Sequence, residues 1–174
     1  TPLYSSAASD VYKRQGHRNA YGRQHGRVLA AQYDEAIVDR LYPGNTHLTS
    51  VMAAVIQEAE SILQLSPEQR PRTMVRIDAA GGSEERIDWL LECGFQVHTK
   101  MLAWKRTAQL VRSVEVWRPS PEHPHRQVGL VCRAHPFVRP TTQVAVRSPK
   151  AKGGWSYHVL VSSLAPEQVI ALSG

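Results

Sequence analysis

TMVRIDAAGGSEERIDWLLECGFQVHT, residues 73–99, combines two strand patterns with a helix pattern between them. Residues 73–77 form an apolar, β-branched run that is typical of a buried strand. Ser83 is suited to cap a helix, and Gly94 is suited to end it about three turns later. Residues 95–99 then form the next expected strand. This order predicts an α/β layer built on a mixed sheet.

The segment upstream of this unit contains the clearest helix pattern of the chain. In residues 49–65 the apolar positions recur at spacings of three and four, which predicts an amphipathic helix. Thr49 or Ser50 is expected to cap this helix, and Pro67 is expected to close it off.

The other expected elements change in character after Lys100. Before it, residues 27–33 and 36–41 are short apolar runs that predict a hairpin. After it, repeated prolines interrupt the chain, and the runs between them alternate or are β-branched. In this second half we expect a helix over residues 105–111 and strands over residues 127–133, 141–147 and 155–162. A further helix is expected to begin at Pro166.

The composition limits the class of protein. The chain has 174 residues, 42% hydrophobic and 21% charged, which is ordinary for a globular protein with one domain or slightly more. No apolar run reaches the roughly 18 residues of a membrane-spanning helix. Two cysteines, Cys93 and Cys132, are too few for a disulfide framework or a four-thiolate zinc site, so a reducing cytosol fits best.

Positive charge is concentrated in one part of the chain. The formal net charge is +6, but residues 100–152 hold eleven Lys or Arg and two Glu, so this part carries +9 and the remainder −3. Aromatic residues are interleaved with these cations, as in Trp117, Trp155 and Tyr157. The pattern fits a surface that contacts a nucleic-acid backbone, or equally a solvated face whose aromatics form a small core.

Asp78 is the candidate catalytic and metal-binding residue. It ends an apolar strand before a glycine-containing loop, where ligands collect in open α/β sheets, and a carboxylate there can hold a hard divalent cation if others converge on it. The alternative is an Asp that accepts N–H bonds from its own loop. The loop lacks the order of a P-loop. The Glu122, His123 and His125 group is more typical of a solvated loop than of a zinc site.

Both ends of the chain look foreign or incomplete. Residues 5–15, SSAASDVYKRQ, resemble the translation of a transposon-derived adapter used to prepare DNA sequencing libraries. We therefore expect residues 1–15 to be a disordered artefact and the chain to be an internal fragment of a longer protein. The expected division is a core part at 16–104, a basic β-rich insertion at 105–164, and the start of a final helix at 165–174.

Several segments from residue 39 onward resemble bacterial insertion-sequence transposases of the DDE design. DRLYPGNT at 39–46 and RID at 76–78 are the first two of these segments. The similarity continues in order through residues 87–100, 105–114, 142–147 and 157–164. One departure is Ala79-Ala80-Gly81, where the family usually has Gly-Gly-Phe after the second acid.

The resemblance implies a ribonuclease H-like mixed sheet with a β-rich insertion. In that family three carboxylates bind two Mg²⁺ ions, which cut and join DNA strands, and Asp78 matches the second acid. The first and third acids would lie outside this fragment, so the fragment should be inactive and its sheet should lack the first strand. The resemblance also implies a cytoplasmic bacterial protein that binds transposon ends and target DNA, with a homodimer as the complete enzyme.

Three hypotheses remain open from the sequence. The first is the transposase fragment, the second is a non-catalytic nucleic-acid-binding remnant, and the third is a divalent-metal nuclease of the same fold. In each of them the DNA contacts, mainly to phosphates, are expected from Arg133, Arg139, Arg147, Lys150 and Lys152.

Overall fold

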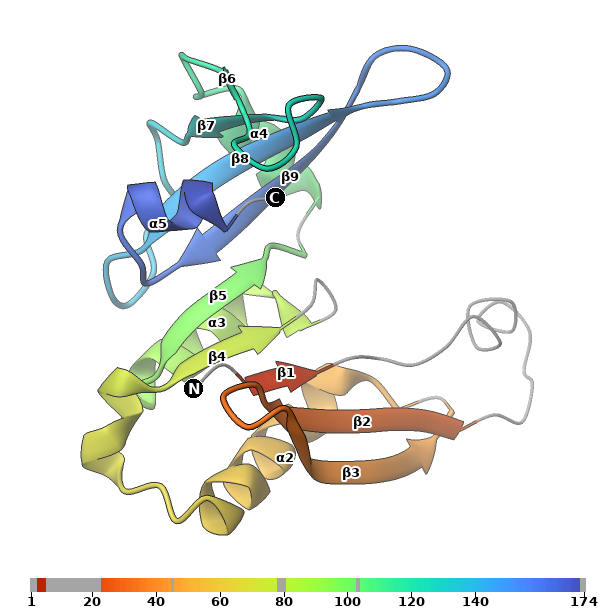
Figure 1. The fold of residues 1–174 in the computed structure, drawn as a ribbon, viewed down its shortest axis with the longest axis vertical. Coiled ribbons are helices and arrows are strands. Elements are labelled where there is room, and N and C mark those ends of the chain that lie inside the picture. The colour runs from red at the N-terminus through yellow and green to blue at the C-terminus, as the bar shows by residue number, and fades with distance from the viewer. Residues whose placement is uncertain (1–2, 6–22, 45, 78–80, 103, 173–174) are drawn as a thin grey trace.

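The structure is a computed structural model that describes residues 3–5, 23–44, 46–77, 81–102 and 104–172. The strands are β1 (Leu3–Ser5), β2 (Arg23–Ala30), β3 (Glu35–Pro43), β4 (Met74–Ile77), β5 (Gln96–Lys100), β6 (Arg118–Pro119), β7 (Gln127–Leu130), β8 (Thr142–Pro149) and β9 (Trp155–Ser162). The helices are α2 (Leu48–Ile62), the 3₁₀ helix η1 (Pro67–Arg72), α3 (Glu84–Glu92), α4 (Trp104–Val111) and α5 (Pro166–Ala171). The strands form one mixed sheet in the order β3-β2-β1-β4-β5-β9-β8-β7-β6 (Figure 1).

The predicted hairpin is confirmed as β2 and β3, which pair antiparallel. Its turn has no Asn-Gly, but Asp34 adopts φ 52°, a left-handed conformation that Asp tolerates better than most residues. The predicted amphipathic helix is confirmed as α2, whose Met52, Val55 and Ile56 are buried in the main core.

The cap predicted for α2 is wrong. His47 is the N-cap residue, and the Ser50 hydroxyl donates to the His47 carbonyl at 2.7 Å instead of accepting from a backbone N–H. The helix also ends three residues earlier than expected, and Pro67 begins η1, with its fixed φ at the first helical position.

The strand–helix–strand unit is confirmed as β4, α3 and β5. β4 and β5 are parallel, with Ile77 opposite Thr99. Ser83 is the N-cap of α3, without a side-chain cap bond, and Gly94 follows the helix with φ +94°, a conformation that favours glycine. Phe95 is 1% exposed and lies in the same core as the buried face of α3.

The expectation of a missing first strand and a disordered segment 1–15 is not met at residues 3–5. β1 lies between β2 and β4, antiparallel to β2 and parallel to β4. The physical reason is that β2 and β4 would otherwise each expose an unpaired edge, and these three residues satisfy the backbone groups of both. The rest of that segment, residues 1–2 and 6–15, lies outside the described residues.

The β-rich half continues the same sheet. The expected strands are confirmed as β7, β8 and β9, although β7 ends at Leu130, and the short strand β6 was not expected. β9 pairs antiparallel with β5, so the segment expected as an insertion shares both a ladder and a core with the first half.

The last two helices cover opposite faces of this half. Ala145 and Val159 belong to the main core, which includes Leu110 of α4. Val144 and Val146 belong to a second core, which includes Val169 of α5. Because alternate residues of a strand point to opposite faces, α4 and α5 lie on different sides of β8 and β9.

Candidate nucleic-acid interface

The carboxyl ends of β1, β4 and β5 meet at one edge of the sheet, because these three strands run parallel. Asp78 is the residue after Ile77 in the sequence, but it lies outside the described residues. The chain that returns from the loop is tied to β5. The Leu102 N–H donates to the Gly82 carbonyl at 2.9 Å, and a Cβ on Gly82 would lie 1.9 Å from the Lys100 carbonyl oxygen.

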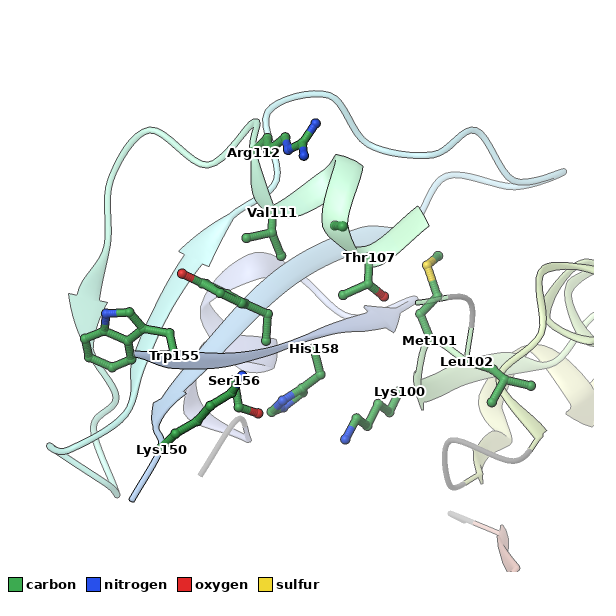
Figure 2. A pocket seen from close by; sticks show the side chains of 12 residues that line it. Lys100, Met101, Leu102, Thr107, Val111, Arg112, Lys150, Trp155, Ser156 and His158 are labelled. Atoms are coloured by element: carbon green, nitrogen blue, oxygen red, sulfur yellow. The ribbon is translucent and has the colours of Figure 1, made fainter. Parts of the chain in front are cut away.

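A pocket of about 670 Å³ opens beside this edge (Figure 2). It is bounded by the end of β5, by α4, by the first half of β9, and by Lys150 at the end of β8. Its polar side chains include Lys100, Lys150 and His158, while Val111 and Tyr157 contribute apolar surface. The volume is in the range of small-ligand sites.

The electrostatics of the pocket favour an anion. Lys100, Arg112 and Lys150 are exposed, and within the described residues no carboxylate lies within 4 Å of their charged nitrogens. Burial lowers the pKa of His158 to about 4, and the positive charges of Lys100 and Arg126 add to this effect. The imidazole is therefore neutral near pH 7, in a field that is positive.

The five predicted DNA contacts are not brought together. Lys150 lines the pocket, and Lys152 is exposed in the adjacent turn between β8 and β9. Arg133 and Arg139 are exposed in the connection between β7 and β8, at the other end of β8. An eight-residue strand is roughly 25 Å long, so the two pairs cannot hold the same phosphate.

The side chain of Arg147 is held by contacts within the protein. Its guanidinium carbon lies 4.4 Å from the ring centroid of Trp117 and 4.6 Å from that of Trp155. The same group donates to Gln127 Oε1 from Nε at 2.8 Å and from Nη2 at 2.5 Å. These cation–π contacts and hydrogen bonds occupy the side chain, so Arg147 holds β7, β8 and the surrounding tryptophans together.

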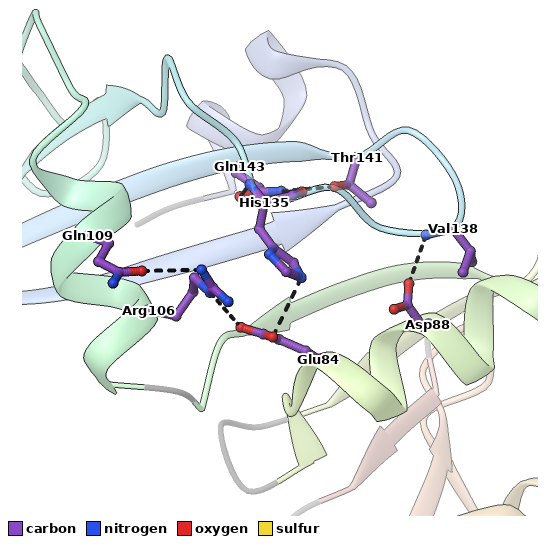
Figure 3. A network of polar contacts seen from close by, with 8 residues as sticks. All are labelled: Glu84, Asp88, Arg106, Gln109, His135, Val138, Thr141 and Gln143. Atoms are coloured by element: carbon purple, nitrogen blue, oxygen red, sulfur yellow. Dashed lines mark hydrogen bonds and ion pairs between the residues drawn. The ribbon is translucent and has the colours of Figure 1, made fainter.

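The connection between β7 and β8 is fastened to the first half (Figure 3). Glu84, at the start of α3, pairs with Arg106 Nε at 3.0 Å and with His135 Nε2 at 3.5 Å. Asp88 accepts the Val138 N–H at 2.8 Å, and Arg139 Nη1 reaches the Leu91 carbonyl at 3.5 Å. Arg139 thus has a protein partner, which limits its freedom to follow a nucleic acid.

Sequence reasoning did not single out Lys100, Arg112 or His158. Lys100 and Arg112 were counted in the basic segment, but nothing local distinguished them from its other cations. His158 lines the same pocket as these cations because the β5–β9 ladder ends before it reaches residue 158. The end of that ladder is set by how the strands pair. The sequence of β9, an alternating strand with one histidine, does not indicate where the neighbouring strand ends.

In the part of the chain that the structure describes, no group of three or more His, Cys, Asp or Glu side chains is placed to hold a metal ion. The rings of His123 and His125 lie 5.6 Å apart, in a tilted arrangement. Cys93 is half-buried, and burial raises the pKa of its thiol, so it stays protonated near neutral pH.

A scan against models of known protein families and a search of curated proteins gave no match for this chain. None of the helices in the described ranges has the length and apolarity needed to cross a membrane.

Proposed function

We propose that this chain is part of a DNA strand-transfer enzyme of the DDE transposase type, with a ribonuclease H-like core. The observation that carries the proposal is the strand order β3-β2-β1-β4-β5, in which β2 is antiparallel to β1, and β4 and β5 are parallel to it. A ribonuclease H-like sheet requires three antiparallel strands followed by two parallel ones. The segments that resemble transposases support the same assignment.

Asp78 is the proposed catalytic carboxylate. It is the next residue in the sequence after β4, whose end lies at the edge where the parallel strands end, and carboxylate oxygens suit a hard cation such as Mg²⁺. Bound Mg²⁺ would activate the attacking oxygen and stabilise the leaving oxygen of a phosphodiester. β1 ends at Ser5, opposite Ile77, and the next residue is Ser6, so this chain supplies no acid directly after β1. We therefore expect the 174-residue chain to bind DNA without cutting it.

The basic half of the sheet is proposed to hold the DNA. Residues 100–152 carry +9, and the pocket at the end of β5 exposes Lys100, Arg112 and Lys150 next to the strand end that precedes Asp78. Cations beside a catalytic edge hold the phosphates of a strand against it and make binding depend on salt. A non-catalytic DNA-binding protein is the second candidate, because the charge and the pocket do not require an active centre.

The test is DNA cleavage by the complete protein that contains this segment. Supercoiled plasmid is incubated with Mg²⁺, and Asp78→Asn is compared with Asp34→Asn, an exposed acid in the β2–β3 turn. We expect Asp78→Asn to lower nicking at least 100-fold without loss of DNA binding, and Asp34→Asn to remain active. Equal activity of Asp78→Asn and the parent would overturn the strand-transfer proposal. Binding without any nicking would favour the DNA-binding candidate.

A further inference from the structure

The pocket lies at an unpaired edge of β9. β5 pairs with β9 only at residues 160–162, and the last bond runs from the Met101 N–H to the Val159 carbonyl at 2.8 Å. Backbone groups alternate sides along a strand, so the N–H and carbonyl of Tyr157 face the same edge as those of Val159. β5 has ended before it reaches Tyr157. The pocket is therefore a notch in the sheet, and the backbone N–H of Tyr157 faces it.

Two lysines line the polar side of this notch, and backbone contacts fix the position of each. Lys100 is the last residue of β5, and its carbonyl is in close contact with Gly82. Lys150 follows β8, where its N–H donates to the Gly154 carbonyl and its carbonyl accepts from Gly153, both at 3.0 Å. Figure 2 shows both side chains among those that line the pocket together with His158.

The neutral imidazole complements the two charges. His158 and Ser156 are alternate residues of β9 and point to one face, whereas Tyr157 points to the other. A neutral imidazole carries one N–H donor, and Ser156 adds a hydroxyl. The notch thus combines two ammonium groups with an imidazole, a hydroxyl and a backbone N–H, all of which can donate to the oxygens of an anion.

We propose that the notch formed by Lys100, Lys150, Ser156 and His158 binds a phosphodiester group of a nucleic-acid strand. The choice of a nucleic-acid strand rests on the proposed function, while the preference for a phosphate group rests on the side chains. The pocket has a volume of about 670 Å³, which is larger than one phosphate needs. The space over Val111 and Tyr157 is therefore available for the attached nucleoside.

Binding should change the titration of His158. The charged groups that act on its imidazole are Lys100 of β5 and Arg126 before β7, and both are positive. Lys150, which lines the same pocket, is also positive. A bound phosphodiester places negative charge among them, so the pKa of His158 should rise from about 4. The imidazole signal can be assigned by its absence in His158→Gln.

The experiment measures binding of the 174-residue chain to fluorescein-labelled single-stranded oligothymidylate, without divalent metal. Lys100→Gln/Lys150→Gln is compared with Arg23→Gln/Arg72→Gln, which removes the same charge from exposed positions outside the pocket and outside residues 100–152. We expect the pocket variant to bind at least 10-fold more weakly, and the control to stay within about 2-fold of the parent. Inorganic phosphate, used as a competitor, should displace the strand only at far higher concentration.

Three results would overturn this inference: equal losses in the two double variants, an unchanged His158 titration on binding, or inorganic phosphate that binds as tightly as the oligonucleotide. The last result would show a site for free anions. The assay requires no cleavage, so it is separate from the Asp78→Asn test. Strand binding that depends on the notch, combined with cleavage that does not depend on Asp78, would keep the phosphodiester site and overturn the strand-transfer proposal.

Discussion

The two halves of the sheet are stabilised by different interactions. Among the described strands, the half from β3 to β5 includes both parallel pairs, and large side chains such as Ile87 and Leu90 of α3, and Phe95, are buried in its core. The half from β9 to β6 is antiparallel, and its strands bury mainly valines, including Val144 and Val159.

The two halves also differ in how their charged side chains are paired. In the first half Arg27 pairs with Asp39, and Arg70 pairs with Glu60 at 2.6 Å. In the second half Arg106 and His135 both reach Glu84, an acid of the first half. Arg27 and Arg70 of the first half are thus neutralised by acids of the same half, whereas Arg112 and Lys150 of the second half are exposed, with no carboxylate within 4 Å of their charged nitrogens among the described residues.

The largest expected effect comes from the core that both halves share. Phe95→Ala should lower the free energy of unfolding by about 4 kcal/mol, because it removes a fully buried aromatic ring. Since the main core also contains Ala145 and Val159, protection from hydrogen exchange should fall in β8 and β9 as well as in β5. Chemical denaturation and hydrogen exchange measure this.

The matched control for that variant is Tyr33→Ala, an aromatic residue that is 58% exposed in the β2–β3 turn and should change stability by less than about 1 kcal/mol. Loss of protection confined to the first half would mean that the two halves unfold separately.

Gly82→Ala should have the next largest effect. The added Cβ would lie 1.9 Å from the Lys100 carbonyl oxygen and 3.1 Å from Thr99 Oγ1, so the backbone must move at the junction of the halves. We expect a loss of about 3 kcal/mol in thermal or denaturant unfolding, together with weaker oligonucleotide binding because Lys100 shifts. Gly153→Asn, at φ +84° with open space around it, should cost less than about 1 kcal/mol.

Acidification should cause a smaller loss of stability, with a contribution from each half. Burial lowers the pKa of His98 on β5, and it lowers that of His158 on β9 to about 4. Between about pH 6.5 and pH 4 the unfolded chain binds protons that the folded chain does not, so stability falls as the pH falls. Unfolding curves of the parent and His158→Gln over this range measure it. An equal slope in both would contradict the role given to His158.

The smallest expected effect is that of Arg147→Gln, which tests whether Arg147 stabilises the fold or binds the oligonucleotide. Arg147→Gln should lower stability by about 1 kcal/mol, because it removes the guanidinium from between Trp117 and Trp155. Oligonucleotide affinity should fall less than it does for Lys150→Gln. A larger loss of affinity in Arg147→Gln, with unchanged stability, would restore Arg147 to the DNA contacts.

Local patterns were sufficient for most elements. The helix α2 and the β4–α3–β5 unit follow from periodicity, and glycine at position 94 marked the end of α3. The predicted ends of helices were less accurate near proline, which can follow one helix and begin the next. Pro67 was expected only to close a helix, and it also starts η1. The cap of α2 was misassigned because a serine near a helix start can donate to a carbonyl as readily as it can accept from an N–H.

For the site, the sequence identified the basic segment but not which of its cations act together. Arg133, Arg147 and Lys150 look alike in the sequence, yet only Lys150 lines the pocket, and Arg147 lies between two tryptophans. Asp78 lies outside the described residues, so its role remains a prediction.

Taken by itself, the sequence determined the type and order of most elements and the separation of charge between the halves, because these depend on neighbours within a few turns or strand residues. Tertiary structure decided that β1 completes the sheet between β2 and β4, that β9 continues it from β5, and that β5 ends early enough to leave a notch. Those features depend on which strands pair and where each ladder stops. The free energy that selects them comes from backbone hydrogen bonds and apolar burial between residues far apart in the chain, and no short pattern records it.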